Sequence, residues 1–167
     1  MNRLLIVIIK IINIGGYMNT LNDLDFSKLL IELVELDYNA VEAYSLAVDK
    51  IENEDYKAPL QKFQQDHERH IKEINEILVN HNQESIKKPT TKQWLLKGKV
   101  LLADITGDDK NILKAMDSIE EESNKAYEEA NQHKDIWNDI TTILKQGLED
   151  ERKHKKWIES TLTSKDS

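Results

Sequence analysis

The sequence predicts an all-α protein, a four-helix bundle in which a long crossover carrying a short helix joins the second helix to the third. The 167-residue chain has only five glycines and two prolines, and 32% of its residues are charged, a composition typical of long helices. Its apolar residues recur at alternating steps of four and three, which places them on one helical face. We expect one domain at residues 22–163, followed by a polar tail at 164–167.

The composition excludes several classes of site and partner. The chain has no cysteine, which rules out disulfides, thiolate zinc sites, iron–sulfur clusters and a rubredoxin-type iron centre. The net charge is −8, whereas binding to phosphates requires a basic surface, so nucleic acid is not expected as the main partner.

Residues 1–17 form an apolar segment separate from the expected domain. The run from Leu4 to Ile14 is too short to span a bilayer and is interrupted by Lys10, which also weakens a signal-peptide interpretation. Two glycine codons stand just before Met18 and can contain a bacterial ribosome-binding sequence. We therefore expect a non-native leader or an unstructured apolar segment here, and a cytoplasmic protein that begins at Met18. Membrane association would require the upstream start to be real.

The first two helices follow from their apolar seams. The first is expected over residues 28–51, with capping side chains just before it at Asn22, Asp23 and Asp25. Its seam consists of Leu29, Leu33, Leu36, Ala40, Ala43 and Ala47. The second helix is expected over residues 55–80, with a proline in its first turns. Its seam is Leu60, Phe63, His67, His70, Ile74 and Ile77.

A connection over residues 81–108 separates the second helix from the third and is too long for a hairpin. Its apolar stretch at 91–105 predicts a short helix laid across the bundle, as expected where two helix pairs are joined. The third helix follows Asp108, with the seam Ile112, Met116, Ile119, Ser123, Ala126 and Ala130. The fourth begins near Asp135, with the seam Ile140, Leu144, Gly147, Glu151, His154 and Ile158.

The two helix pairs repeat each other, which predicts a pseudo-two-fold axis through the bundle. Asp37 and Tyr44 of the first helix correspond to Glu120 and Tyr127 of the third, at an offset of 83 residues. A site on such an axis takes equivalent residues from each half.

Ionisable residues occupy inward positions on all four helices. Residues three apart share a helical face, so the six side chains should converge: Asp37, His67, His70, Glu120, Glu151 and His154. A buried carboxylate must be protonated, paired or metal-bound. Carboxylates can bridge two ions and each imidazole supplies one nitrogen, so we expect one or two divalent ions at mid-bundle. A metal-free network of histidines and carboxylates fits the same pattern.

Other polar residues have simpler expected roles. Tyr44 and Tyr127 are candidates for hydrogen bonds to the ligands, or else plain core aromatics. The charged residues outside the inward set are expected to face solvent: Glu35, Glu42, Asp49, Glu68, Arg69, Glu121, Glu128, Arg152 and Lys153.

These motifs resemble the ferritin-like superfamily, in which the first and third helices carry carboxylates and the second and fourth carry Glu-x-x-His pairs. Glu151-x-x-His154 matches the fourth-helix motif, and Glu120 matches the third-helix glutamate. The chain is most similar to small bacterial ferritin-like proteins related to rubrerythrin and bacterioferritin. The resemblance covers residues 25–162 and implies two bound ions, iron first and manganese or zinc as alternatives.

The chain departs from the superfamily pattern at two positions. His67 stands where glutamate is expected, and Asp37 replaces the glutamate of the first helix. Three carboxylates leave two divalent ions with excess positive charge unless Asp66 or a solvent hydroxide contributes. An added imidazole favours a lower-charge metal state or a borderline metal such as zinc.

Three functions stay open from the sequence. The first is a di-iron protein that oxidises Fe(II) or reduces oxygen or peroxide, as the resemblance implies. The second is a metal-storage or metal-buffering protein, and the third is a metal-free helical stress or interaction module. The expected partners are metal ions with oxygen or peroxide, and a homodimer is compatible with each function.

Overall fold

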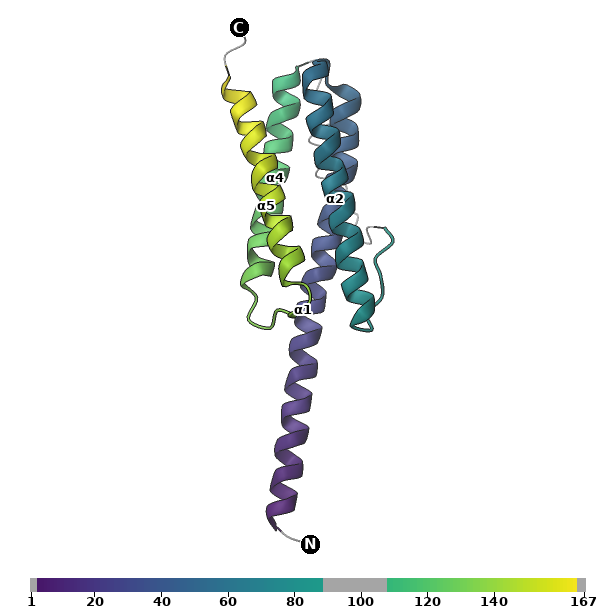
Figure 1. The fold of residues 1–167 in the computed structure, drawn as a ribbon, viewed down its shortest axis with the longest axis vertical. Helices are drawn as coiled ribbons and strands as arrows, with labels where there is room; N and C mark the ends of the chain where they lie inside the picture. The colour runs from purple at the N-terminus through teal and green to yellow at the C-terminus, as the bar shows by residue number, and fades with distance from the viewer. Residues whose placement is uncertain (1–2, 89–107, 165–167) are drawn as a thin grey trace.

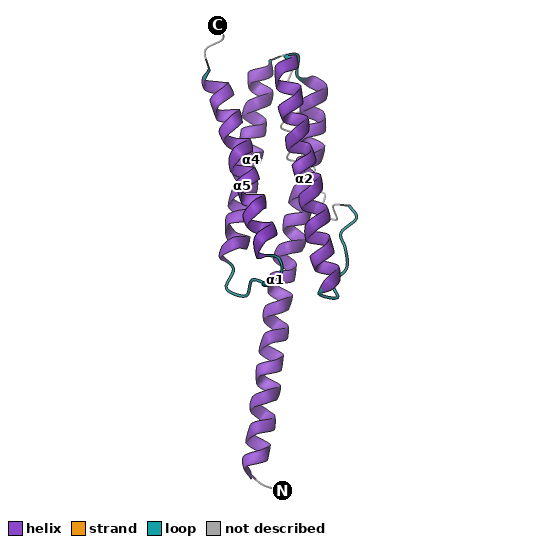
Figure 2. Ribbon diagram, viewed as in Figure 1, coloured by secondary structure: helices purple, strands orange, loops and turns teal. Residues whose placement is uncertain are grey.

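Within the residues described, the chain folds into four helices and contains no strand (Figures 1 and 2). The computed structural model describes residues 3–88 and 108–164, with side chains from residue 25 onward. The helices are α1 (Arg3–Lys50), α2 (Glu54–Asn80), α4 (Asp109–Gln132) and α5 (Thr141–Thr163). The predicted all-α fold is therefore confirmed. The short helix expected at residues 91–105 lies outside the described residues.

The helix directions show why a long crossover is needed. Helices α1 and α5 run in one direction and α2 and α4 in the other (Figure 1). The start of α4 lies beside the start of α2, because the Asp109 carboxylate accepts the backbone N–H groups of Glu52 and Asn53, both at 2.8 Å. The end of α2 lies at the opposite end of the bundle, so the connection from α2 to α4 joins opposite ends of the bundle.

Side-chain caps and packing fix where the helices begin. Asn53 caps α2 by accepting the N–H of Asp55 at 2.9 Å, and Asp108 caps α4 by accepting the N–H of Lys110 at 2.9 Å. Such caps satisfy backbone donors that the first turn leaves free. The bounds of α2 and α4 agree with the sequence prediction.

Helix α1 differs from the prediction, because it does not begin at the capping residues Asn22, Asp23 and Asp25. It runs unbroken from Arg3, and its N-terminal part projects beyond the other helices (Figure 1). A capping side chain acts only where the backbone leaves the helix, and here it does not. None of the helices in the described part of the chain combines the length and hydropathy needed to cross a bilayer. A leader over residues 1–17 remains a prediction.

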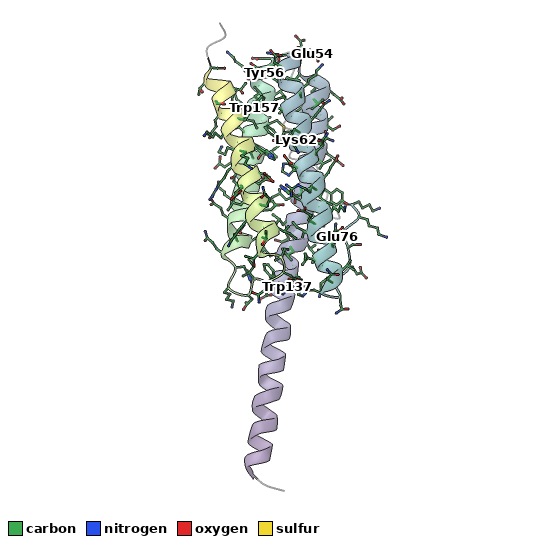
Figure 3. The ribbon with its side chains drawn as sticks, viewed as in Figure 1. Glu54, Tyr56, Lys62, Glu76, Trp137 and Trp157 are labelled. Carbon is green, nitrogen blue, oxygen red and sulfur yellow. The ribbon has the colours of Figure 1, made fainter. Side chains whose placement is uncertain are left out.

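Helix α5 also begins later than predicted, at Thr141 rather than near Asp135. The preceding turns bury the Trp137 side chain at one end of the bundle (Figure 3). The Trp137 ring packs edge-on against Phe26 at 5.2 Å and stacks on His81 at 3.7 Å between centroids. The residues before Thr141 are not helical, and Trp137 reaches its aromatic partners from this segment. Helix propensity alone does not predict these contacts.

The core is divided into two apolar clusters with a polar layer between them. One cluster contains Phe26, Leu30, Ile74 and Leu144, together with neighbouring apolar residues. The other is built from Tyr44, Leu60, Ile112, Met116 and Ile158 with their neighbours. On every helix, the inward ionisable residues lie between the residues that belong to one apolar cluster and those that belong to the other. The fold therefore holds these residues at mid-bundle between two apolar layers.

Candidate metal centre

The six predicted side chains lie together in the polar layer. None of them exposes more than 1% of its surface. They form two overlapping groups, and within each group one potential ligand atom per residue lies within 4.8 Å of all the others. The first group is Asp37, His67, His70 and Glu151, and the second is His67, Glu120, Glu151 and His154. The sequence therefore located the members of the cluster.

Helical spacing aims these residues at one another. The two histidines of α2 and the Glu151–His154 pair of α5 are each three residues apart, so each pair shares one face. Asp37 and Glu120 enter the layer from α1 and α4. Every helix thus contributes at least one nitrogen or oxygen donor, and no loop residue is required.

His67 occupies the middle of the cluster and uses both ring nitrogens. Its Nδ1 atom lies 2.9 Å from Oδ1 of Asp37 and 3.6 Å from Oε1 of Glu151. Its Nε2 atom lies 3.5 Å from Oε1 of Glu120. The ring therefore stands between the carboxylates of α1 and α4.

His70 directs one nitrogen inward and the other outward. Nδ1 lies 3.3 Å from Oε1 of Glu151, while Nε2 lies 3.6 Å from Oδ2 of Asp150. Arg69 donates to that same Asp150 oxygen at 2.5 Å and to Glu73 at 2.9 Å. The expectation that Arg69 merely faces solvent is therefore wrong, because its guanidinium holds the outer carboxylate of His70.

His154 repeats this arrangement on the other helix pair. Its Nδ1 atom lies 3.6 Å from Oε2 of Glu120, and its Nε2 atom lies 3.4 Å from Oδ2 of Asp66. A carboxylate behind the second imidazole nitrogen is the usual support for a metal-binding histidine. Asp66 of α2 lies behind His154 of α5, and Asp150 of α5 lies behind His70 of α2. Each aspartate therefore supports a histidine of the opposite helix.

The outer carboxylates line a groove between α2 and α5. This groove has a volume of about 530 Å³ and reaches His154 past Asp66, Arg69 and Asp150. Sequence reasoning did not assign Asp150 a role. The internal repeat of the sequence could have indicated this role, because an aspartate lies four residues before His70 and again four residues before His154.

Two buried tyrosines complete the polar layer. The Tyr127 hydroxyl donates to Oδ2 of Asp37 at 2.8 Å, and the Tyr44 hydroxyl donates to Oε1 of Glu120. Each tyrosine thus bonds the carboxylate of the other helix. Both tyrosines are therefore hydrogen-bonded to carboxylates of the cluster and are not plain core aromatics.

Charge pairing shifts the acidities of the cluster. Burial raises the pKa of Glu151 to about 7, with His67 opposing the rise and Glu120 adding to it. Burial alone would lower the pKa of His70, but Asp150, Asp37 and Glu151 together raise it to about 10. Near neutral pH His70 is therefore protonated and Glu151 is partly protonated, and any cation bound at these atoms must displace those protons.

The remaining carboxylates and His67 behave as ion-pair partners. Burial would raise the pKa of Asp37 and of Glu120, but hydrogen bonds and charge from the histidines lower both. Burial would lower the pKa of His67, but Glu151, Asp37 and Glu120 raise it well above its ordinary value. The metal-free cluster is therefore partly neutralised by its own protons.

Five inward atoms have no hydrogen-bond partner among the described residues: Nδ1 of His70, Nδ1 of His154, Oε2 of Glu120 and both carboxylate oxygens of Glu151. They lie close to opposite charges without the alignment of a hydrogen bond. A divalent ion accepts such lone pairs together, and a mixed imidazole and carboxylate set suits iron, manganese or zinc. The donor set therefore fits a transition-metal site.

Glu35, also outside the cluster, departs from its predicted position. Glu35 was expected on a solvent-facing stripe with Glu42 and Asp49, but only 6% of its surface is exposed. It lines a groove between α1 and α4 with Leu29, Leu33 and other residues of the two helices. Asp49 is exposed, as predicted. This acidic stripe of α1 therefore faces solvent at Asp49 and lies in the α1–α4 interface at Glu35.

Comparison with protein families matches residues 25–133 to the family described as "Domain of unknown function (DUF2383)". The matched range includes Asp37, His67, His70 and Glu120, and it ends before the α5 residues of the cluster. No curated protein and no solved structure matches the chain.

Proposed function

This chain belongs to the DUF2383 family, and we propose that it is a ferritin-like metal-binding protein whose core holds one or two divalent transition-metal ions. The proposed ligands are Asp37, His67, His70, Glu120, Glu151 and His154. The observation that carries the proposal is the set of five buried, inward-facing nitrogen and oxygen atoms with no hydrogen-bond partner among the described residues.

Those five atoms destabilise the metal-free fold. A buried polar atom without a partner destabilises a protein by roughly 1–3 kcal/mol, and here several of them face one another. Glu151 is the extreme case, because neither of its carboxylate oxygens has a hydrogen bond among the described residues and its side chain is fully buried. A metal ion would replace this unfavourable desolvation with coordination bonds, so the folded state should bind it strongly.

The residues around the ligands support this function. Tyr127 and Tyr44 would fix the orientation of Asp37 and Glu120, and Asp150 would hold the outer nitrogen of His70. Burial raises the pKa of both tyrosines well above the usual value, so each hydroxyl keeps its proton and remains a donor. Such supporting partners typically change metal affinity by about 10–100-fold.

The resemblance to ferritin-like proteins favours iron and a pair of ions. Bound iron would supply one-electron redox chemistry for Fe(II) oxidation or for reduction of oxygen or peroxide. The residues of the chain would hold the metal, exclude bulk water and move protons through the paired histidines and aspartates. Because the chain lacks cysteine, no thiolate can serve as a ligand, and the proposed ligand atoms are all nitrogen and oxygen.

A metal-free or metal-buffering module is the second candidate, and one contact favours it. The 2.9 Å bond between His67 and Asp37 shows that the cluster compensates part of its charge internally. A helical stress or interaction protein could retain such a network without turnover. The two candidates differ in whether metal binds stoichiometrically and whether bound iron is oxidised.

Metal analysis of the full chain tests the proposal. Protein purified without added metal is analysed by mass spectrometry, then melted with Fe(II), Mn(II) or Zn(II). We expect stoichiometric metal and a higher melting temperature, since an ion at a hundred times its Kd stabilises the fold by about 2.7 kcal/mol. Glu151→Gln should lose the shift, whereas Glu149→Gln, at an exposed position of the same helix, should retain it. Absence of both metal and shift would reject the proposal.

Iron oxidation is measured on the same protein. The chain is loaded with Fe(II) without oxygen, then exposed to air or peroxide while near-ultraviolet absorbance is recorded. A rise that Glu151→Gln abolishes supports the redox function. Bound Fe(II) that stays ferrous supports buffering instead.

A further inference from the structure

We propose that the imidazole ring of His67 bridges two metal positions, with Nδ1 facing one position and Nε2 facing the other. This inference rests on the proposed function and specifies how the two ligand groups are joined. Bridging by a ring nitrogen pair differs from the carboxylate that the ferritin-like pattern places at this position.

The first support is the contrast between His67 and the other two histidines. His70 and His154 each have one nitrogen facing an outer aspartate, at 3.6 and 3.4 Å, and the outer nitrogen of His70 also lies 3.2 Å from the Arg69 guanidinium. For His67, the structure instead places Nδ1 beside Asp37 at 2.9 Å and Nε2 beside Glu120 at 3.5 Å. Both of its nitrogens therefore face inward carboxylates, and neither has the outer support usual for a terminal histidine ligand.

The second support is the membership of the two ligand groups. They share only His67 and Glu151, so any bridge must come from one of these side chains. Asp37 belongs to one group and Glu120 to the other, and these two carboxylates contact different nitrogens of the ring. His67 thus touches each group through a separate atom.

A bridging ring would also change the charge of the site. Two divalent ions bring four positive charges, whereas Asp37, Glu120 and Glu151 supply three negative charges. When metal–nitrogen bonds form at both ring nitrogens, the N–H protons pass to solvent and the ring becomes an anion, which completes the balance. Proton release is the general consequence of metal binding to such ligands. No oxidant or reductant is involved.

The geometry has a consequence for the metals. The two nitrogens lie on different sides of a rigid ring, so ions bound to them are held further apart than the roughly 3.5–4 Å usual in two-metal sites. Any magnetic coupling between the two ions should therefore pass through the ring. His67 is therefore the residue that determines how many ions bind and how strongly they couple.

The zinc-loaded full chain tests the bridge directly by crystallography. We expect two zinc ions per chain, one bonded to each ring nitrogen of His67 at about 2.0–2.1 Å. Two ions with either ring nitrogen left unbonded would overturn the inference, as would a single ion, and both results leave the proposed metal-binding function intact. No bound zinc would reject both.

Copper provides an independent measurement in solution. Two Cu(II) ions coupled through the ring should give a spin-resonance signal smaller than the total copper content. His67→Gln preserves polarity but cannot bridge through two nitrogens, so its remaining copper should show full intensity. His81→Gln, which changes a histidine paired with Asp139 outside the cluster, should behave as the parent does. Full signal intensity in the parent at two Cu(II) ions per chain would contradict the bridge.

Discussion

The Tyr127 hydroxyl and the Asp37 carboxylate are 90 residues apart in the chain but are joined by a 2.8 Å hydrogen bond inside the bundle. The bond crosses from α4 to α1. Its counterpart runs the opposite way, from Tyr44 of α1 to Glu120 of α4. The two bonds therefore tie both helix pairs together at the level of the proposed metal centre and hold one ligand of each half.

Removing the Tyr127 hydroxyl should weaken both stability and metal binding. Tyr127→Phe leaves a buried Asp37 oxygen without its donor, and we expect a loss of about 1–3 kcal/mol in the unfolding free energy of the metal-free protein. Zinc affinity should fall by about 10–100-fold. Urea unfolding and competition with a chelator measure the two effects. Tyr56→Phe, at the far end of the bundle (Figure 3), is the control and should change neither.

Gly147 permits the close packing of Tyr127 and should not tolerate a side chain. A Cβ atom at this position would lie 2.3 Å from Cε1 of Tyr127 and 2.9 Å from Cδ1. Gly147→Ala therefore displaces the ring and its bond to Asp37, and overpacking of this kind costs about 1–3 kcal/mol. Lys145→Ala, at an exposed position of the same helix, is the matched control. Equal stability of the two variants would show that the ring moves freely.

The sequence predicted the cluster because its members obey helical periodicity. His67 and His70, or Glu151 and His154, cannot lie in an apolar seam without facing the core. Periodicity does not report which atoms meet across helices, so it could not show that Asp150 supports His70 or that His67 lies between two carboxylates. Those contacts depend on how far neighbouring helices are shifted along their axes relative to one another.

The helix boundaries show a second limit of the sequence. Asp108 and Asn53 cap their helices as their residue types suggest. By contrast, Asn22, Asp23 and Asp25 are equally suitable caps, and α1 passes through them. Likewise, the buried Trp137 delays the start of α5 because it must contact Phe26, a residue distant in the sequence. Local propensity decides a boundary only where tertiary contacts do not oppose it.

The outer aspartates should tune the site without being ligands. Asp150→Asn and Asp66→Asn remove the charge behind His70 and His154, so each should lower zinc affinity by about 10–100-fold while retaining the number of bound ions. Isothermal titration with zinc measures affinity and stoichiometry together. Asp139→Asn, which alters the carboxylate paired with His81, should have no effect. Loss of an ion in either outer variant would identify that aspartate as a ligand.

Metal should stabilise the protein more as pH rises. The folded pKa of Glu151 is about 7 against an ordinary 4.5, and that of His70 is about 10 against 6.5. A raised pKa contributes stability that is complete below the unfolded value and is lost as pH rises through the folded value. The unfolding free energy of the metal-free chain should therefore decrease between pH 4.5, the ordinary pKa of Glu151, and about pH 10, the folded pKa of His70. Asp37 and Glu120 have lowered pKa values, so their contributions are lost only in acid, outside this range.

The opposite trend is expected with zinc, because deprotonated Glu151 and His70 are the forms that coordinate it. Urea unfolding at several pH values, with chelator and with saturating zinc, should give two curves that diverge as pH increases. Of Glu151 and His70, His70 has the higher folded pKa. Without metal, the unfolding free energy of His70→Gln should therefore change less with pH above neutral than that of the parent chain. Parallel curves for the metal-free and zinc-bound chain would mean that zinc binds away from these two residues, since binding elsewhere displaces none of their protons.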